Sequence, residues 1–398
     1  MDLHSEHPLW LLQHGLLTVV PPLDTDLSCE VLVVGAGITG ALVANRLVDC
    51  GVDCAVIDTR DLGQGSTSAS TALLQYDIDV PLCELRTKIN PEHAERAYRA
   101  GVEAIDGLAA LCAPWPECGF HRRSSIFLTR DENDTGFMRS ELDARRAAGL
   151  ACRWIDAEEL TSRWGFRAAG AIHSETAAQV DPYRLTHRLL RDCIDRGVRV
   201  HDRTGVLLID EQEDTIVVTT DRAAVRARWV VMATGYESVE WLPQRVVDLQ
   251  STYAVVSEPL DPSAAWAERC LVWEHADPYI YARWTDDHRL LFGGGDVPFK
   301  NAALRDKLIK QKSRALIDDM ADLCPKLRIE PAFAWAGTFG TTKDGLGYIG
   351  APPDRRRVLF ALGFGGNGIT YSEIASRVIA DTVRGRHHPD APIFAFDR

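Results

Sequence analysis

Residues 30–58 carry a clear pattern of apolar and polar positions near the start of the chain. Residues 31–34 form an uninterrupted apolar run that ends at a glycine, which is typical of a buried parallel strand. Apolar residues then recur at helical spacing as far as Gly51, a residue that can end a helix. The sequence CAVID (54–58) predicts the next strand. The pattern therefore predicts a complete β-α-β unit.

Further patterned segments follow in the middle and at the end of the chain. Residues 181–235 predict a helix with Leu185, Leu189, Cys193 and Ile194 on one face, then a hairpin over GVLLIDEQEDTIVVTTD and the strand WVVMATG (229–235). In residues 250–300 the strand-like segments have alternating positions, as in YIYARW (279–284) and RLLFGGG (289–295), and this pattern predicts an antiparallel sheet. Residues 301–324 predict an amphipathic helix or helix pair. The strand VLFALGF (358–364) then precedes a final helix.

The α/β segments lie on both sides of the antiparallel segment, so one domain is expected to be discontinuous. We predict an N-terminal extension over 1–28. A dinucleotide-binding domain is expected over 29–80, 150–240 and 330–398, and a substrate domain over 81–149 and 241–329.

Composition narrows the classes of function. The formal net charge of −13 disfavours a general affinity for nucleic acid. The ten cysteines include no CxxC pair and no ligand-like Cys/His spacing, so we expect reduced thiols and no metal site. The N-terminus carries acidic residues where a signal peptide needs basic ones, and no apolar run is long enough for a membrane span. The sequence thus predicts a soluble, cytoplasmic protein.

The glycines of EVLVVGAGITG (30–40) form a GxGxxG motif between the predicted strand and helix. Gly35 allows the tight turn, Gly37 lets the backbone approach a pyrophosphate, and Gly40 lets the helix lie close to the strand. Asp58 ends the second strand, where a carboxylate can accept hydrogen bonds from ribose hydroxyls. The motif alone is compatible with NAD, NADP or FAD, or with a turn kept for packing, although Asp58 disfavours the 2′-phosphate of NADP.

Three further segments indicate FAD rather than NAD. They are the Gly/Ser/Thr-rich TRDLGQGSTSASTALLQYDID (59–79), ATG at 233–235 and GFGGNGIT at 363–370. In this order, the motifs resemble the D-amino acid oxidase superfamily of FAD-dependent amine and amino acid oxidoreductases, over most of the chain. YIYARWTDDHRLLFGGGD (279–296) is most similar to the γ-glutamylputrescine oxidoreductase branch. The resemblance implies an α/β fold with a discontinuous Rossmann-like FAD-binding domain and an antiparallel-sheet substrate domain, of the glutathione reductase and p-hydroxybenzoate hydroxylase type.

The resemblance also implies which residues bind FAD. The pyrophosphate residues would be Gly35, Ala36, Gly37, Ile38, Thr39 and Gly40. The adenosine residues would be Asp58, Thr59, Arg60, Val206, Ala233, Thr234 and Gly235. The residues along the ribityl chain and the flavin would be Gly65, Ser66, Thr67, Ser68, Thr71, Ala72 and Leu73. The residues at the pyrimidine edge would be Gly363, Gly365, Gly366, Asn367, Gly368 and Ile369, with backbone amides able to stabilise negative charge on the reduced ring.

The substrate side departs from the glycine oxidase pattern. The segment WAGTFGTTKDGLGYIG (335–350) places Phe339 where those proteins carry an arginine that holds the substrate carboxylate, and Gly340 replaces a proline. A simple α-amino acid is therefore disfavoured as substrate. Arg283 is either an anion-binding residue or a surface arginine, and Lys343 is a candidate for a place near the flavin, where it would help oxygen react. The candidates for an aromatic substrate pocket are Tyr253, Tyr279, Tyr281, Trp284 and Trp335.

The resemblance bears on the chemistry as well. Flavin carries the difficult step, so no obligatory catalytic side chain is expected. Gly337 stands where one branch attaches flavin through cysteine, and 63–76 contains no histidine, so we expect non-covalent FAD. The predicted reaction is oxidation of an amine or amino acid, with O2 or another electron acceptor. The alternatives are an FAD-binding subunit without its own turnover and, less favoured, an NAD-dependent dehydrogenase.

Overall fold

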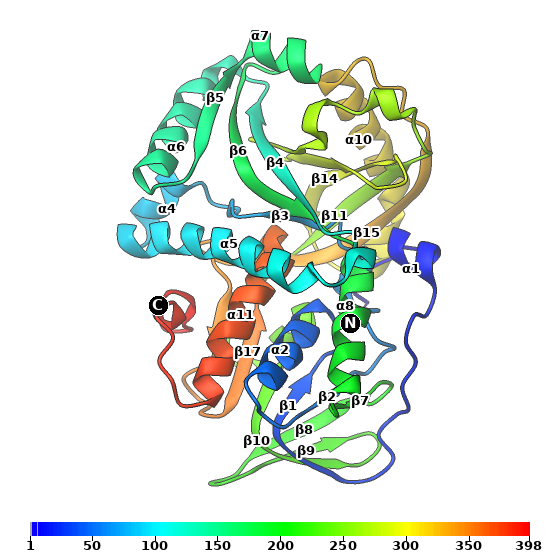
Figure 1. Ribbon diagram of the computed structural model, residues 1–398, viewed down its shortest axis with the longest axis vertical. Helices are drawn as coiled ribbons and strands as arrows, with labels where there is room; N and C mark the ends of the chain where they lie inside the picture. The colour runs from blue at the N-terminus through cyan, green and yellow to red at the C-terminus, as the bar shows by residue number, and fades with distance from the viewer. Residues whose placement is uncertain (1, 6) are drawn as a thin grey trace.

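Two β-sheets organise the chain in the computed structural model, which describes residues 2–5 and 7–398 (Figure 1). The eight-stranded sheet runs β16-β17-β10-β1-β2-β7, and the hairpin β8–β9 joins it through β10. Its strands are β1 (Leu27–Val34), β2 (Cys54–Ile57), β7 (Arg199–His201), β8 (Val206–Glu211), β9 (Ile216–Thr220), β10 (Ala224–Met232), β16 (Tyr348–Gly350) and β17 (Val358–Leu362).

The second sheet has nine strands in the order β15-β11-β14-β13-β12-β4-β6-β3, with β5 paired to β6. Its strands are β3 (Leu73–Gln75), β4 (His121–Thr129), β5 (Cys152–Asp156), β6 (Gly170–Gln179), β11 (Asp248–Ser257), β12 (Leu271–Glu274), β13 (Ile280–Trp284), β14 (Leu290–Pro298) and β15 (Pro331–Thr341). The helices are α1 (Leu9–His14), α2 (Ile38–Asp49), α3 (Ser66–Ala69), α4 (Leu82–Lys88), α5 (Pro91–Cys112), α6 (Thr135–Ala147), α7 (Ala157–Glu159), α8 (Pro182–Asp195), α9 (Ala302–Lys307), α10 (Ile309–Leu323) and α11 (Gly368–Val383).

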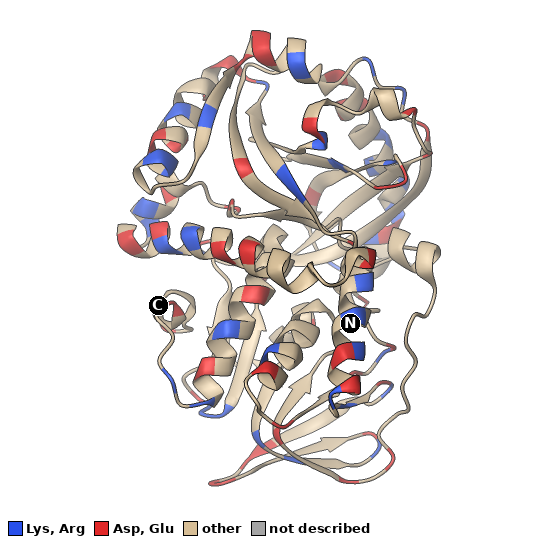
Figure 2. Cartoon of the chain, viewed as in Figure 1, with Lys and Arg blue, Asp and Glu red and all other residues tan. Residues whose placement is uncertain are grey.

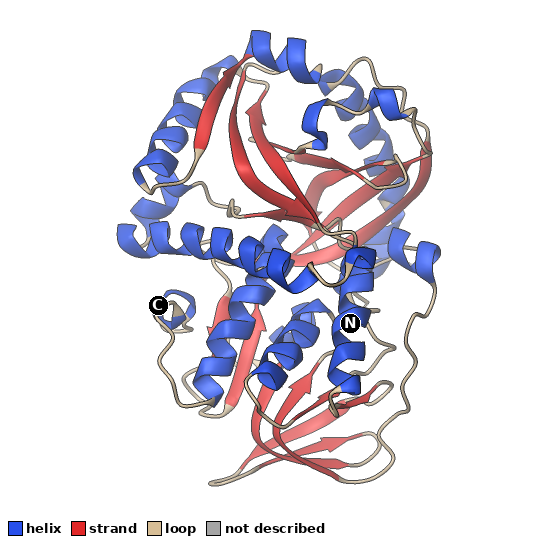
Figure 3. Cartoon of the chain, in the orientation of Figure 1, coloured by secondary structure: helices blue, strands red, loops and turns tan. Residues whose placement is uncertain are grey.

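The first sheet is parallel at its centre, where β1 pairs with β2 on one side and β10 on the other. Both faces of these strands are buried, which explains why the sequence of β1 contains a continuous apolar run and not an alternation of apolar and polar residues. Helices α2, α8 and α11 cover one face (Figure 3). The hairpin β8–β9 contributes Ile209, Ile216 and Val218 to the apolar cluster on the other face.

Helix α5 lies between the two sheets, where it contacts α11 on one side and β6 on the other (Figure 1). Acidic and basic residues interleave along it (Figure 2), and pairs such as Arg99–Glu95 and Arg96–Glu103 satisfy many of them. Within the described part of the chain, no helix combines the length and the apolar character needed to cross a membrane.

The sequence predictions of individual elements are confirmed for the β-α-β unit, the β8–β9 hairpin, the antiparallel strands of 250–300 and the helix pair α9–α10. The domain boundaries differ from the prediction. Strands β3, β5, β6 and β15 lie in the nine-stranded sheet, although 29–80, 150–240 and 330–398 were assigned to the dinucleotide-binding domain. Strand β6 pairs with β4 and β15 pairs with β11, whereas β3 and β5 join the sheet through β6, and no change of composition marks the transition.

The N-terminal segment extends the second sheet at β15. Thr338 N–H donates to the Leu3 carbonyl at 2.9 Å, and Ser5 N–H donates to the Ala336 carbonyl at 3.0 Å. The side chain of His4 lies 3.1 Å from the Gln64 carbonyl, next to the Gly/Ser-rich segment. Residues 3–5 therefore bind both the sheet and the predicted cofactor loop.

Candidate functional site

The GxGxxG turn lies between β1 and α2, and two of its glycines are required by close backbone contacts. A Cβ on Gly35 would overlap the Ala233 carbonyl, and Gly35 has a positive φ of 111°. A Cβ on Gly40 would overlap the Gly35 carbonyl and lie 2.9 Å from its carbon. The turn thus brings β10 and α2 close together, with the N-terminus of α2 facing the loop that follows β2.

The residues around this helix terminus provide polar groups of the kind a dinucleotide needs. Ile38 N–H donates to Thr67 Oγ1 at 2.9 Å, which places α3 beside the start of α2. Ser66 Oγ is buried and has no hydrogen-bond partner among the described residues. Free amides and a hydroxyl at a helix N-terminus form an anion-binding arrangement suited to a pyrophosphate.

Asp58 lies at the end of β2, as predicted, and its carboxylate holds the turn. Ala36 N–H donates to Oδ2 at 2.6 Å and Arg60 N–H donates to Oδ1 at 2.8 Å. Burial raises the pKa of Asp58 to about 6, against the lowering effect of these two hydrogen bonds. Each carboxylate oxygen keeps a second lone pair with which it can accept a ribose hydroxyl.

Two adjoining hollows surround the turn and share Ile38, Thr39, Ser66, Thr67 and Gly235. The first hollow extends to Asp58 and Trp241, and the second extends to Phe364 and Gly368 at the start of α11. Together they form an elongated site that runs from the end of β2 to the end of β17.

Many predicted cofactor residues meet in these hollows. Those that line them are Gly35, Gly37, Ile38, Thr39, Asp58, Thr59, Arg60, Gly65, Ser66, Thr67, Val206, Ala233, Thr234, Gly235, Gly363, Gly368 and Ile369. Those that do not are Ala36, Gly40, Ser68, Thr71, Ala72, Leu73, Gly365, Gly366 and Asn367. Lining residues that sequence reasoning missed are Leu3, Val34, Thr204, Gly205, Glu237, Glu240, Trp241, Ser70, Tyr236, Ala361, Leu362 and Phe364.

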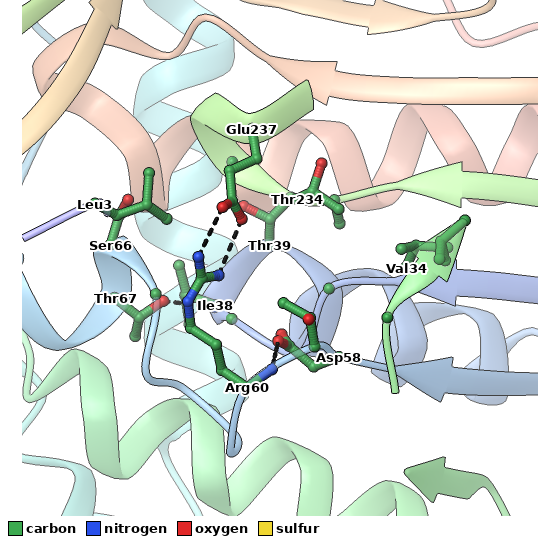
Figure 4. A pocket seen from close by; sticks show the side chains of 18 of the residues that line it. Leu3, Val34, Ile38, Thr39, Asp58, Arg60, Ser66, Thr67, Thr234 and Glu237 are labelled. Carbon is green, nitrogen blue, oxygen red and sulfur yellow. Dashed lines mark hydrogen bonds and ion pairs between the residues drawn. The ribbon is translucent and has the colours of Figure 1, made fainter. Parts of the chain in front are cut away.

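Arg60 and Glu237 face each other across the first hollow (Figure 4). The guanidinium donates to both carboxylate oxygens, at 2.9 and 2.7 Å. Burial raises the pKa of Glu237, but hydrogen bonds and nearby positive charge, those of Arg60 among them, hold that pKa below its usual value. Because Glu237 is a single acid in an unpatterned turn, no sequence signal identified it.

The start of α11 differs from the prediction that its amides are free for the cofactor. Gly366 N–H donates to the Asp79 carboxylate at 3.2 Å, and the Asn367 side-chain amide donates to the Asp77 carbonyl at 2.7 Å. Asp79 was not among the predicted residues. It puts a carboxylate at the place where the amides of Gly365 and Gly366 were expected to face the flavin.

The substrate candidates divide between the two faces of the nine-stranded sheet. Tyr253 and Trp284 pack in the apolar cluster with α10, on the face opposite to Tyr281. Tyr281 and Arg283 are two residues apart in β13, so their side chains lie on the same face of the sheet, opposite to the face that packs against α10. The rings of Tyr279 and Tyr281 lie 6.0 Å apart. Phe339 is half-buried on β15.

Three other candidates have structural partners. Arg283 is buried, and it donates to the carbonyls of Thr71 at 2.6 Å and Val180 at 3.2 Å, so it is neither a surface arginine nor free to bind an anion. Trp335 is buried and donates to the Ala69 carbonyl at 2.9 Å. Lys343 is exposed, with Nζ 3.3 Å from the Arg398 carbonyl, and lines neither hollow.

The chain matches the family of FAD-dependent oxidoreductases (DAO) over residues 30–382. It belongs to that family. The γ-glutamylputrescine oxidoreductase of Escherichia coli is 22% identical, with 92% of this chain and 86% of the relative covered. The glycine oxidase of Bacillus licheniformis is 25% identical, and the match covers 89% of this chain and 93% of the relative. The crystal structure of glycine oxidase from Geobacillus kaustophilus has the same fold, with a TM-score of 0.79 and 21% identity. The match covers 94% of this chain and 99% of that structure.

Membership of the DAO family identifies the protein as an enzyme with FAD as its cofactor. The residues present fit that group. The close glycine turn, the Ser66 hydroxyl, which no described residue contacts by a hydrogen bond, and the elongated pair of hollows provide a cradle for a dinucleotide.

We expect FAD affinity to fall as pH drops through about 6, the pKa of buried Asp58. Protonation removes the ionised acceptor for the ribose hydroxyls, so an apoprotein titration followed by flavin fluorescence should show a dissociation constant several-fold higher at about pH 5 than at about pH 7.5. In the apoprotein, the effect of pH on folding stability has the opposite sign to its effect on FAD affinity. The folded state holds this proton more tightly than the unfolded chain does, so Asp58 favours unfolding as pH rises from about 4 to about 6.

Asp58→Asn provides the control, because its amide does not titrate. This variant should bind FAD more weakly and with little pH dependence over the same range. An unchanged wild-type affinity across this range would contradict the role given to Asp58.

Arg60→Ala should raise the dissociation constant of FAD by about tenfold. Without the guanidinium, the charge of Glu237 stays in the first hollow near the expected phosphates. Arg60→Ala/Glu237→Gln removes both charges and should recover most of the loss. A double-mutant cycle by FAD titration measures this coupling, and additive single effects would show that the pair does not act on the cofactor as a unit.

Proposed function

We propose that this DAO-family enzyme oxidises a C–N bond of an amine or amino acid. Bound FAD would supply the hydride acceptor that converts C–N to C=N, and the resulting imine would hydrolyse in water. The observation that carries the proposal is that two lining residues of the second hollow adjoin the nine-stranded sheet. Ser70 precedes Thr71, whose carbonyl accepts a hydrogen bond from Arg283 of β13. Tyr236 packs against Gly340, the neighbour of Phe339 on β15. The printed activities of the relatives, γ-glutamylputrescine oxidoreductase and glycine oxidase, support the same class of reaction.

The chain's own residues would bind and orient the cofactor and the substrate. The turn from Gly35 to Gly40 and Asp58 would hold the adenosine and pyrophosphate parts, and Ser66 and Thr67 would hold the middle of the cofactor. Tyr279, Tyr281 and Phe339 would exclude water from the reacting carbon. The attachment would be non-covalent, because Gly337 offers no nucleophile to the flavin.

The test is anaerobic reduction of the purified holoenzyme by a panel of amines, N-methyl amines and amino acids, followed at the flavin band. Bleaching by one class, with recovery of colour on admitting O2 or an added acceptor, would support the proposal. FAD released by acid precipitation would support non-covalent binding. A flavin that dithionite reduces but the whole panel leaves oxidised would favour a flavoprotein subunit without its own turnover.

A further inference from the structure

Two carboxylates and two tyrosines gather beside one face of the nine-stranded sheet. Asp79 follows β3 and Asp296 lies in β14, whereas Tyr279 lies just before β13 and Tyr281 lies within it. Asp79 and Asp296 act electrostatically on each other and on Tyr279. Burial raises the pKa of Asp296, and the hydroxyls of Thr252 and Tyr279 lower it. The side chains of Asp79, Asp296, Tyr279 and Tyr281, called here the acidic cluster, are therefore neighbours, although they come from two strands and two loops that are separate in the sequence.

The acidic cluster reaches the flavin end through Asp79. The Asp79 carboxylate accepts the Gly366 N–H, and a Cβ on Gly365 would overlap Asp79 Oδ2. Tyr236 lines the second hollow, its hydroxyl donates to the Gly365 carbonyl at 3.5 Å, and the charge of Asp79 contributes to the rise in its pKa. A group bound at the acidic cluster would lie next to the flavin.

The acidic cluster has an excess of negative charge and one acceptor without a partner. Desolvation by the surrounding protein raises the pKa of Asp79, which is exposed, and of Asp296, which is half-buried, to about 6 each. Asp296 Oδ1 is buried and has no hydrogen-bond partner among the described residues. Lys312 is a cation that acts on Asp296, and its Nζ lies over the ring of Tyr253 and 3.8 Å from the position that a Cβ on Gly295 would take. No hydrogen bond joins Lys312 to Asp296 Oδ1, so this buried oxygen can accept a further cation or donor.

The groups that would accept a substrate carboxylate are absent from this place. Phe339 stands where the glycine oxidase pattern has its arginine, and the Arg283 guanidinium is committed to the carbonyls of Thr71 and Val180. An α-carboxylate placed here would be repelled by the two carboxylates of Asp79 and Asp296, with Lys312 the cation that acts on Asp296. An ammonium group would meet carboxylate oxygens and the faces of tyrosine rings, both of which attract cations.

We infer that Asp79 and Asp296 select an amine substrate that carries its positive charge on a group other than the reacting nitrogen, which must be neutral to release hydride from its carbon, and that has no carboxylate on the reacting carbon. This inference rests on the proposed C–N oxidation and names the substrate class of the same site. Asp296 would hold the cation through Oδ1, and Asp79 would add attraction at the flavin end. The tyrosine rings would cover the alkyl chain.

The test uses the holoenzyme and two measurements. The first is the change in the flavin absorption band on titration with tetramethylammonium, a cation that cannot be oxidised, compared with acetate. The second is anaerobic flavin reduction by butylamine, 1,4-diaminobutane, glycine and alanine, which gives the half-saturating concentration of each. Asp296→Asn keeps the size of the side chain, and Asp248→Asn, an exposed acid of β11, is the matched control.

Wild-type enzyme should respond to tetramethylammonium and not to acetate, and it should be reduced by an amine and not by glycine or alanine. Asp296→Asn should raise the half-saturating concentrations of tetramethylammonium and of the amine at least about tenfold, while Asp248→Asn changes neither. Reduction by glycine or alanine, or an equal response to acetate, would overturn the inference, and both results come from the wild type without any variant. A tetramethylammonium response that Asp296→Asn weakens, with no reduction by any compound, would uphold the cation site and count against the proposed oxidation.

Discussion

Gly40→Ala is expected to yield protein that has lost most of its FAD. The new Cβ would overlap the Gly35 carbonyl oxygen inside the turn, and both atoms belong to backbone, so no side chain can move aside. Relieving the overlap must shift the start of α2 away from β1, which moves the amides that face the pyrophosphate. Overpacking of this kind costs about 1–3 kcal/mol of stability. The FAD-to-protein ratio of the purified variant, from the visible and ultraviolet absorbance, measures the effect.

Gly136→Ala is the matched control for this substitution. Gly136 lies in the first turn of α6, where an added Cβ meets nothing within 4 Å. Alanine should be neutral there or stabilise the helix by up to about 1 kcal/mol. Retention of a full complement of FAD by Gly40→Ala, with an unchanged melting temperature, would refute the packing argument for the turn.

The dinucleotide turn was predictable because its constraints are local. A strand, a glycine turn, a helix and a terminal aspartate follow within 29 residues, from Glu30 to Asp58, and each contact depends on neighbours in sequence. The sheet to which β5, β6 and β15 belong was not predictable in this way. Their membership depends on the pairing of β6 with β4, of β15 with β11 and of β5 with β6, and alternation in a strand does not say which partner it will find.

The substrate face shows the same limit at the level of single residues. Tyr253 and Tyr281 both lie in strands with alternating patterns, but register places Tyr253 toward α10 and Tyr281 on the other face. A register shift between Ser251 and Tyr253 interrupts the alternation along β11. Asp79 and Glu237 had no pattern to mark them, because an isolated acid gains meaning only from what the fold places beside it.

Arg283→Ala is expected to lower the melting temperature and to release FAD on heating at a lower temperature than wild type. The guanidinium joins the Thr71 carbonyl, in the predicted flavin segment, to the Val180 carbonyl just before α8, and it lies 5.5 Å from the Trp10 ring centre. Alanine leaves two carbonyls without a donor and opens a cavity, at a cost of about 2–4 kcal/mol. Burial lowers the pKa of Arg283 to about 10, which shows that the cation itself is costly to bury. Removal of this buried charge therefore offsets part of the stability lost in Arg283→Ala.

Arg283→Met should be less harmful than alanine, because methionine fills much of the space and removes the buried charge while still losing the two hydrogen bonds. Arg245→Ala, which removes an exposed arginine paired with Asp248, should change stability by no more than about 0.5 kcal/mol. Thermal unfolding followed by flavin fluorescence should place Arg283→Ala about 5 °C or more below wild type. A role in binding a substrate anion gives the opposite signature, in which the melting temperature is unchanged and the KM rises. That signature would show that the guanidinium leaves the carbonyls of Thr71 and Val180 to bind substrate in the working enzyme.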